Sequence, residues 1–137
     1  MIVSFCRARG SEKLTLKSRF GSADAKTARQ WAKALKFLDP TLQLVSCGKE
    51  GYDSWDWIVL HELVDVVDYH SLHLYTKGSS HEMSVMGSAA AEKAIRMTME
   101  VVDLARIAKG TSNRPKICFD EWSVDGQTSG CGGGSWY

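Results

Sequence analysis

Residues 116–124 read KICFDEWSV, an apolar run that ends in two acidic residues and a tryptophan. A short apolar run of this kind, bounded by turn residues, is typical of a buried β-strand. Alternation with a period of two divides the run into two faces: Ile117, Phe119 and Glu121 against Cys118, Asp120 and Trp122. Glu121 would then be a carboxylate at the carboxyl end of an apolar strand.

The position of Glu121 gives it a possible chemical role. Active sites of α/β barrels and of open parallel sheets are built at the carboxyl ends of their strands. Glu121 is therefore a candidate catalytic residue. The alternative is a solvent-exposed glutamate just past a strand, or a partner for a nearby lysine.

A second strand-like run lies upstream, over Asp68–Tyr75. His73 and Tyr75 fall on one face of it together with Ser71, whereas the intervening leucines would point toward covering helices. An imidazole and a phenol at the end of a strand can hold sugar hydroxyls and orient a carboxylate. The alternative is a buried histidine and tyrosine that are satisfied by backbone groups.

Helical and strand-like segments alternate along the chain. The apolar periodicity of amphipathic helices is found over residues 25–38, 54–67 and 88–109. The strand-like runs are 42–47, 68–75 and 116–122. Such alternation implies right-handed crossovers and a parallel sheet, so the predicted fold class is α/β.

The two ends of the chain differ from this middle part. Met1–Gly21 is basic and shows little period, and we expect a solvated segment there. A transit peptide or a phosphate-binding arm is the alternative for this basic segment. Residues 126–137 are glycine-rich and polar with no apolar face, so we expect a disordered tail.

Composition and charge narrow the functional classes. The chain has 137 residues, enough for one hydrophobic core, and a formal net charge of +1. No global field would steer it to nucleic acid, and no apolar run approaches the roughly 20 residues that span a bilayer. The first ten residues do not read as an export signal. We expect a cytoplasmic protein by default, or a secreted one if its parent carries a signal peptide.

Metal and cofactor chemistry is not indicated. The four cysteines show no CxxC pair or zinc spacing, and free thiols are favoured over a disulfide framework. His70 and His73 fall on opposite faces of their strand and would not ligate one ion. Asp65 and Asp68 flank the turn before that strand and are expected to be solvated. We predict no metal and no cofactor.

Three segments resemble the family 51 α-L-arabinofuranosidases. AKTARQWAKALKFLDP (25–40) with LQLVSCG (42–48) is similar to the family's helix and fifth barrel strand. VDVVDYHSLHLY (64–75) and KICFDEWSV resemble its sixth and seventh strands. The order and separations also fit. The resemblance implies that residues 22–125 are a fragment of a TIM (β/α)₈ barrel, with about three parallel strands, the fifth to the seventh, and their helices.

The same resemblance implies a retaining glycoside hydrolase that removes terminal non-reducing α-L-arabinofuranosyl residues from polysaccharides or oligosaccharides. Glu121, in the DEW motif, would be the nucleophile. His73 and Tyr75, in an HxY pattern, would contact the arabinofuranosyl unit or the nucleophile, and Trp122 would contact substrate. In a retaining mechanism one carboxylate attacks the anomeric carbon, while a second, about 5–5.5 Å away, protonates the leaving oxygen.

The sequence departs from the family pattern in two places. The family's acid/base glutamate follows an asparagine at the end of the fourth strand, but Met1–Gly21 contains no asparagine. Asp125 replaces the aromatic residue that commonly follows the DEWxV segment. Since a complete barrel takes about 250 residues, we expect an incomplete chain that is inactive alone. The alternatives are a non-catalytic α/β module that binds a carbohydrate or another partner, or a product without function. The oligomeric state is not predictable.

Overall fold

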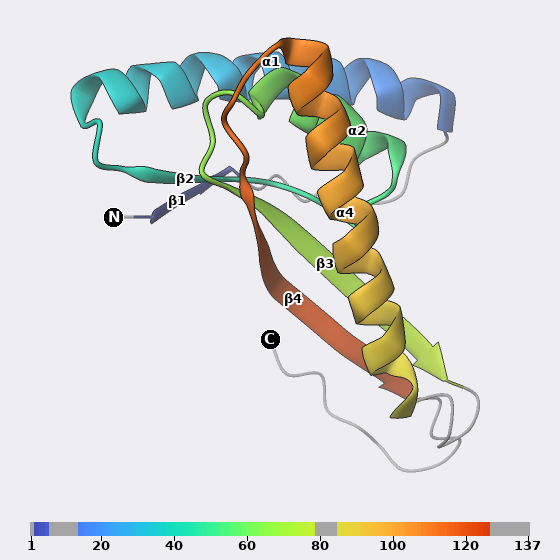
Figure 1. Ribbon diagram of the computed structural model, residues 1–137. Helices are drawn as coiled ribbons and strands as arrows, with labels where there is room; N and C mark the ends of the chain where they lie inside the picture. Colours follow the sequence, from blue (N-terminus) through green and yellow to red (C-terminus); the bar gives the residue numbers. More distant parts are fainter. Residues whose placement is uncertain (1, 6–13, 79–84, 127–137) are drawn as a thin grey trace, which may run out of the picture.

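The computed structural model describes residues 2–5, 14–78 and 85–126, which form a parallel sheet with helices packed against it (Figure 1). The strands lie in the order β1-β2-β3-β4, and each neighbouring pair is parallel. The predicted α/β class and parallel sheet are confirmed. In chain order the elements are β1 (Ile2–Phe5), α1 (Leu14–Leu38), β2 (Gln43–Ser46), α2 (Ser54–Leu63), β3 (Tyr69–Gly78), α4 (Gly87–Lys109) and β4 (Lys116–Gly126).

The N-terminal part of the fold has more structure than the sequence indicates. Ile2–Phe5 pairs in parallel with Gln43–Ser46, which adds a strand that the sequence pattern does not predict. α1 begins at Leu14 and continues through Gly21, so the boundary expected after residue 21 falls inside a helix. Four residues are too few for a period of two to show, and a glycine within a helix costs only about 1 kcal/mol. The predicted tail lies outside the described residues, apart from Gly126 at the end of β4.

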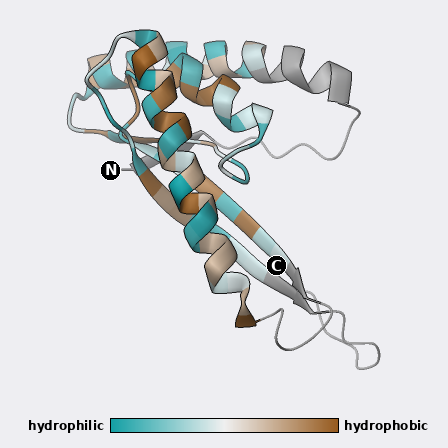
Figure 2. Cartoon of the chain, turned by 45° about the vertical axis from the view of Figure 1, so that its right-hand side comes forward, coloured by the Kyte–Doolittle hydropathy of each residue, from teal (hydrophilic) through white to brown (hydrophobic). Residues whose placement is uncertain are grey.

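Two clusters of buried side chains hold the helices to the sheet. The alternation of hydrophobic and hydrophilic residues along α4 is that of an amphipathic helix packed beside β3 and β4 (Figures 1 and 2). Among the described residues, no helix is long and apolar enough to cross a membrane. One cluster comprises Ala25, Ala32, Leu42, Leu44, Val59, Leu63 and Val67. The other comprises Leu60, Val64, Val102 and Ala105, with Ile117 packed against it.

Helix ends are defined by local signals. Asp53 precedes α2 and forms a capping box with Asp56. In this box the side chain of each residue accepts a hydrogen bond from the backbone N–H of the other. α4 ends at Gly110, whose φ of 66° lies in the left-handed region that favours glycine. These two signals set the loops that lead out of β2 and into β4.

Two acidic residues ahead of β3, Asp65 and Asp68, pair with basic side chains of α1. From the sequence both are expected to be solvated, and this expectation is wrong. Asp65 accepts hydrogen bonds from both terminal nitrogens of Arg29, one of them at 2.6 Å. The Asp68 Oδ2 atom lies 2.8 Å from Lys36 Nζ and accepts the backbone N–H of Leu44, also at 2.8 Å. The sequence pattern places both basic residues away from the apolar face of α1, but it cannot show which carboxylates come within their reach.

The Arg29–Asp65 pair gives a pH-dependent prediction. The hydrogen bonds from Arg29 hold the pKa of Asp65 below its usual range. A carboxyl with a lowered folded-state pKa stabilises the fold above its unfolded pKa of about 3.9, and this contribution is lost as the pH falls toward the folded value. We expect Asp65→Asn to lower the free energy of unfolding by about 1 kcal/mol near pH 7 and by less near pH 3.

Urea unfolding at the two pH values measures this difference. Asp24→Asn serves as the control, because it also removes one aspartate charge but at a position on α1. It should have little effect at either pH. Equal losses of stability for Asp65→Asn at both pH values would contradict the assignment of Asp65 as the partner of Arg29.

Candidate active site

The register between β3 and β4 changes once along their length. Tyr69–Leu72 lies opposite Lys116–Phe119 in order, but the next pair is His73 with Glu121. Asp120 is therefore an extra residue on β4, and the irregularity is a β-bulge. Bulges of this kind redirect side chains and are common beside active sites.

The bulge changes the face on which Glu121 lies. Ile117 packs against Val102 and Ala105 on the helix-covered face of the sheet. A regular strand would place Glu121 on that same face. Because Asp120 is inserted, Glu121 lies instead on the face of His73, its partner in the register. The predicted alternation, with Ile117 and Glu121 on one face, is wrong because one extra residue reverses the faces beyond it.

Four side chains meet on the face of the sheet away from the helices. Ser71 Oγ donates to Asp120 Oδ1 at 2.6 Å and lies 2.7 Å from His73 Nε2. This Nε2 atom is 3.4 Å from Asp120 Oδ1, while His73 Nδ1 is 3.9 Å from Glu121 Oε2. The imidazole is 18% exposed and the Glu121 side chain 53% exposed. A carboxylate supported by an imidazole is thus accessible to a substrate.

The four residues predicted for the site are not all brought together. His73 and Glu121 are register partners, and Tyr75 follows two residues later on the same face of β3, with its side chain exposed. Trp122 is paired with Leu74 and therefore lies on the opposite face, where it is 70% exposed. Sequence reasoning missed Asp120 as a neighbour of His73, because a bulge leaves no signal in the hydrophobic period.

The Cys118 thiol adjoins this group. Cys118 is the register partner of Ser71 and precedes the bulge residue Asp120 by two positions on β4. Burial, and then the charge of Asp120, raise the pKa of Cys118. The thiol stays protonated at neutral pH and is a poor nucleophile there. The candidate nucleophile of this cluster is therefore the carboxylate of Glu121.

A buried carboxylate orders the loop between β2 and α2. Asp56 accepts the backbone N–H groups of Lys49, Gly51 and Asp53 at 2.7, 2.9 and 3.2 Å. Its Oδ1 atom also lies 3.1 Å from Nε2 of His70, and both side chains are fully buried. Since this carboxylate satisfies three amides of one short loop, the loop has a defined conformation.

The ordered loop is joined to the candidate site through β3. His73 donates its backbone N–H to the carbonyl of Lys49 at 2.6 Å. A Cβ atom at Gly48 would lie 1.7 Å from the carbonyl oxygen of Ser71, so the close approach of loop and strand requires glycine. His70, whose Nδ1 is 2.9 Å from Ser46 Oγ, belongs to this support and lies on the other side of β3 from His73.

Replacement of Asp56 should therefore be strongly destabilising. Asp56→Leu leaves three amides and His70 without their acceptor, and we expect the free energy of unfolding to fall by about 3–5 kcal/mol. Asp56→Asn keeps one acceptor oxygen and should cost less. Urea unfolding followed by circular dichroism ranks the two variants. A loss within about 0.5 kcal/mol for Asp56→Leu would show that the loop does not depend on this carboxylate.

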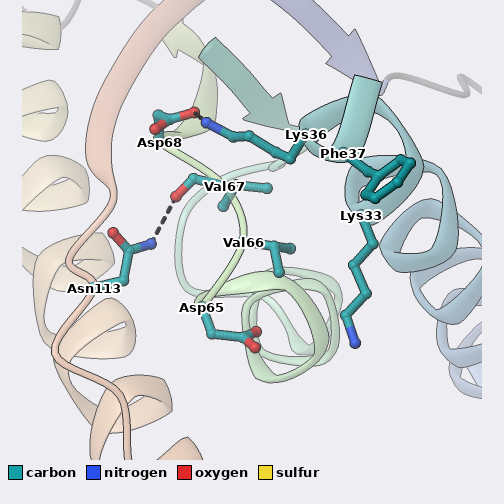
Figure 3. A pocket seen from close by; sticks show the side chains of 8 residues that line it. All are labelled: Lys33, Lys36, Phe37, Asp65, Val66, Val67, Asp68 and Asn113. Carbon is teal, nitrogen blue, oxygen red and sulfur yellow. Dashed lines mark hydrogen bonds and ion pairs between the residues drawn. The ribbon is translucent and has the colours of Figure 1, made fainter. Parts of the chain in front are cut away.

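A pocket lies at the opposite end of β3 from the candidate site and is not a catalytic candidate. Its polar groups bind one another: Asn113 Nδ2 donates to the Val67 carbonyl at 2.8 Å, and Lys36 pairs with Asp68 (Figure 3). Within the part of the chain that the structure describes, no group of three or more histidine, cysteine, aspartate or glutamate side chains could hold a metal ion. The pocket is lined by Lys33, Lys36, Phe37, Asp65, Val66, Val67, Asp68 and Asn113.

The fold and the site define a class of protein. Parallel strands joined by helices, with a carboxylate and an imidazole in register on neighbouring strands, fit an α/β-barrel enzyme. The two strands extend past these residues, to Gly78 and Gly126, and so end later than the sequence predicts. No family model matches the sequence. Known proteins do match it. α-L-Arabinofuranosidase C of Emericella nidulans is 47% identical over 115 residues, which cover 73% of this chain and 23% of that protein.

Solved structures give the same result. AbfB, a family 51 α-L-arabinofuranosidase from Bifidobacterium longum, superposes with a TM-score of 0.63 at 25% identity, over 76% of this chain and 22% of its own. The α-L-arabinofuranosidase of Thermotoga maritima, solved as an arabinose complex, gives a TM-score of 0.65 at 27% identity, over 76% and 21%. The chain belongs to the family 51 glycoside hydrolases, the α-L-arabinofuranosidases, and matches part of their barrel. It spans less than a quarter of the length of these relatives.

Proposed function

We propose that this chain is the part of a retaining α-L-arabinofuranosidase barrel that carries the nucleophile, Glu121. The observation that carries the proposal is the position of Glu121. Its exposed carboxylate lies midway along β4, just past the bulge, in register with His73 on the neighbouring parallel strand. The relatives are named arabinofuranosidases, and one structure holds arabinose. The substrate class would be carbohydrates with terminal non-reducing α-L-arabinofuranosyl residues.

In this proposal each residue has a limited task. Glu121 attacks the anomeric carbon and forms a glycosyl-enzyme ester, which water later hydrolyses with net retention of configuration. His73 orients the Glu121 carboxylate, and Tyr75, exposed further along the same face, contacts the sugar. Trp122 lies on the opposite face of β4. It would contact substrate only through loops from outside these strands that close over that face.

The second carboxylate of a retaining mechanism is not among these residues. The strand beside β2 is β1, and the sequence that follows it, CRARG at 6–10, contains no acidic residue. General acid/base assistance contributes about 10²–10⁴-fold, and the preorganised barrel contributes more. The chain alone is therefore proposed to be inactive toward ordinary arabinofuranosides, and its catalytic part is tested within a complete barrel.

A barrel hybrid tests the role of Glu121. Residues 24–124 of this chain replace the matching segment of the Emericella nidulans enzyme, which supplies the remaining strands. We expect hydrolysis of an arabinofuranosyl substrate with retained anomeric configuration. Glu121→Gln in the hybrid should lower kcat by about 10⁴-fold or more, because an amide cannot form the glycosyl-enzyme ester. Product formation and its stereochemistry are followed by NMR.

A matched control and a labelling experiment sharpen the result. Glu100→Gln changes an exposed glutamate on α4 and should leave the hybrid's activity unchanged. A mechanism-based arabinofuranosyl inhibitor should label the peptide that contains Glu121. Normal turnover by the Glu121→Gln hybrid, or a label on another carboxylate, would show that Glu121 is not the nucleophile.

A further inference from the structure

The His73 imidazole lies between two carboxylates of β4 because of the bulge. Its Nε2 atom faces Asp120 at 3.4 Å and its Nδ1 atom faces Glu121 at 3.9 Å. Ser71 stands between the imidazole and Asp120, with its Oγ atom 2.7 Å from Nε2 and 2.6 Å from Oδ1. A regular β4 would offer His73 only one of these carboxylates, since adjacent residues alternate in face.

The number of hydrogens in this group fixes where the imidazole carries its proton. A carboxylate only accepts hydrogen bonds, so the single hydroxyl hydrogen of Ser71 goes to Asp120. The Ser71 oxygen then accepts, and the donor to it must be the Nε2–H of His73. With Nε2 protonated, any further proton on the ring is held at Nδ1, the atom that faces Glu121.

We propose that Asp120 is a positioning residue that acts through Ser71 and His73 on the nucleophile. It holds the proton of the neutral imidazole at Nε2 and keeps Nδ1 directed at Glu121. The Nδ1 atom can then bind a proton beside the Glu121 carboxylate and stabilise its negative charge before attack and again when the glycosyl-enzyme ester is hydrolysed. The inference rests on the proposed role of Glu121.

The other ionisable groups near His73 do not compete for this role. The Cys118 thiol is neutral at neutral pH, since burial and Asp120 raise its pKa. The backbone carbonyl of Lys49 accepts the His73 N–H. The side-chain ammonium group of Lys49 is paired with Asp53. Among the described residues, the carboxylates that pair with the His73 ring are those of Asp120 and Glu121.

The position of the ring proton can be read by NMR in the full chain without turnover. At about pH 8, where an ordinary imidazole is neutral, ¹⁵N spectra distinguish the protonated ring nitrogen from the unprotonated one. We expect Nε2 of His73 to carry the proton in the wild-type chain. In Asp120→Ala, Ser71 is free to donate to Nε2, and the proton should move to Nδ1, where Glu121 accepts it. Asp24→Ala, the same change on α1, should leave the tautomer as in the wild type.

Two results would overturn the inference. One is a wild-type His73 that is protonated only at Nδ1, which decides the question even if Asp120→Ala does not fold. The other is a folded Asp120→Ala chain in which Nε2 keeps the proton. Because these spectra need no catalysis, a failure here is distinguishable from a failure of the nucleophile assignment, which is read from Glu121→Gln in the barrel hybrid.

Discussion

The pairing of β3 with β4, and the single residue inserted into it, determine which side chains face the candidate site. Up to Leu72 and Phe119 the two strands pair regularly, and their apolar side chains pack beneath the helices. One residue later, Asp120 is left over and the faces of β4 reverse. Without that insertion Glu121 would lie under α4, where a carboxylate would be costly to bury. The bulge thus allows one strand to supply both a hydrophobic core and an exposed charged cluster.

The backbone of His73 in this cluster is held by the layer behind it. The carboxylate of Asp56 orders the loop after β2, and that loop accepts the backbone N–H of His73 through Lys49. A buried polar network of this kind is stabilising only when each of its groups is satisfied, and here the three amides and His70 all find the same acceptor. His70 and His73 are three residues apart yet serve different purposes, one structural and the other facing the nucleophile candidate.

Sequence patterns predict the larger features of this fold and miss the local ones. The alternation of helices and strands was sufficient for the parallel order of β2, β3 and β4, because each helix shows its period over ten residues or more. β1 is too short to show any period. The bulge at Asp120 is also invisible, since it depends on cross-strand pairing and not on hydrophobicity. Strand position makes His73, Tyr75 and Glu121 candidates for the site, whereas the role of Trp122 comes from the resemblance to the arabinofuranosidases alone. The register places Trp122 on the face of β4 opposite Glu121.

Glu121 lies on the same face of the sheet as His73, and nuclear Overhauser effects test this placement directly. The structure predicts contacts between the ring protons of His73 and the Glu121 side-chain protons. A regular strand would instead place Glu121 with Ile117, near the methyl groups of Val102 and Ala105. Cross-peaks from Glu121 to His73 would support the bulged register, and cross-peaks from Glu121 to Val102 or Ala105 would contradict it.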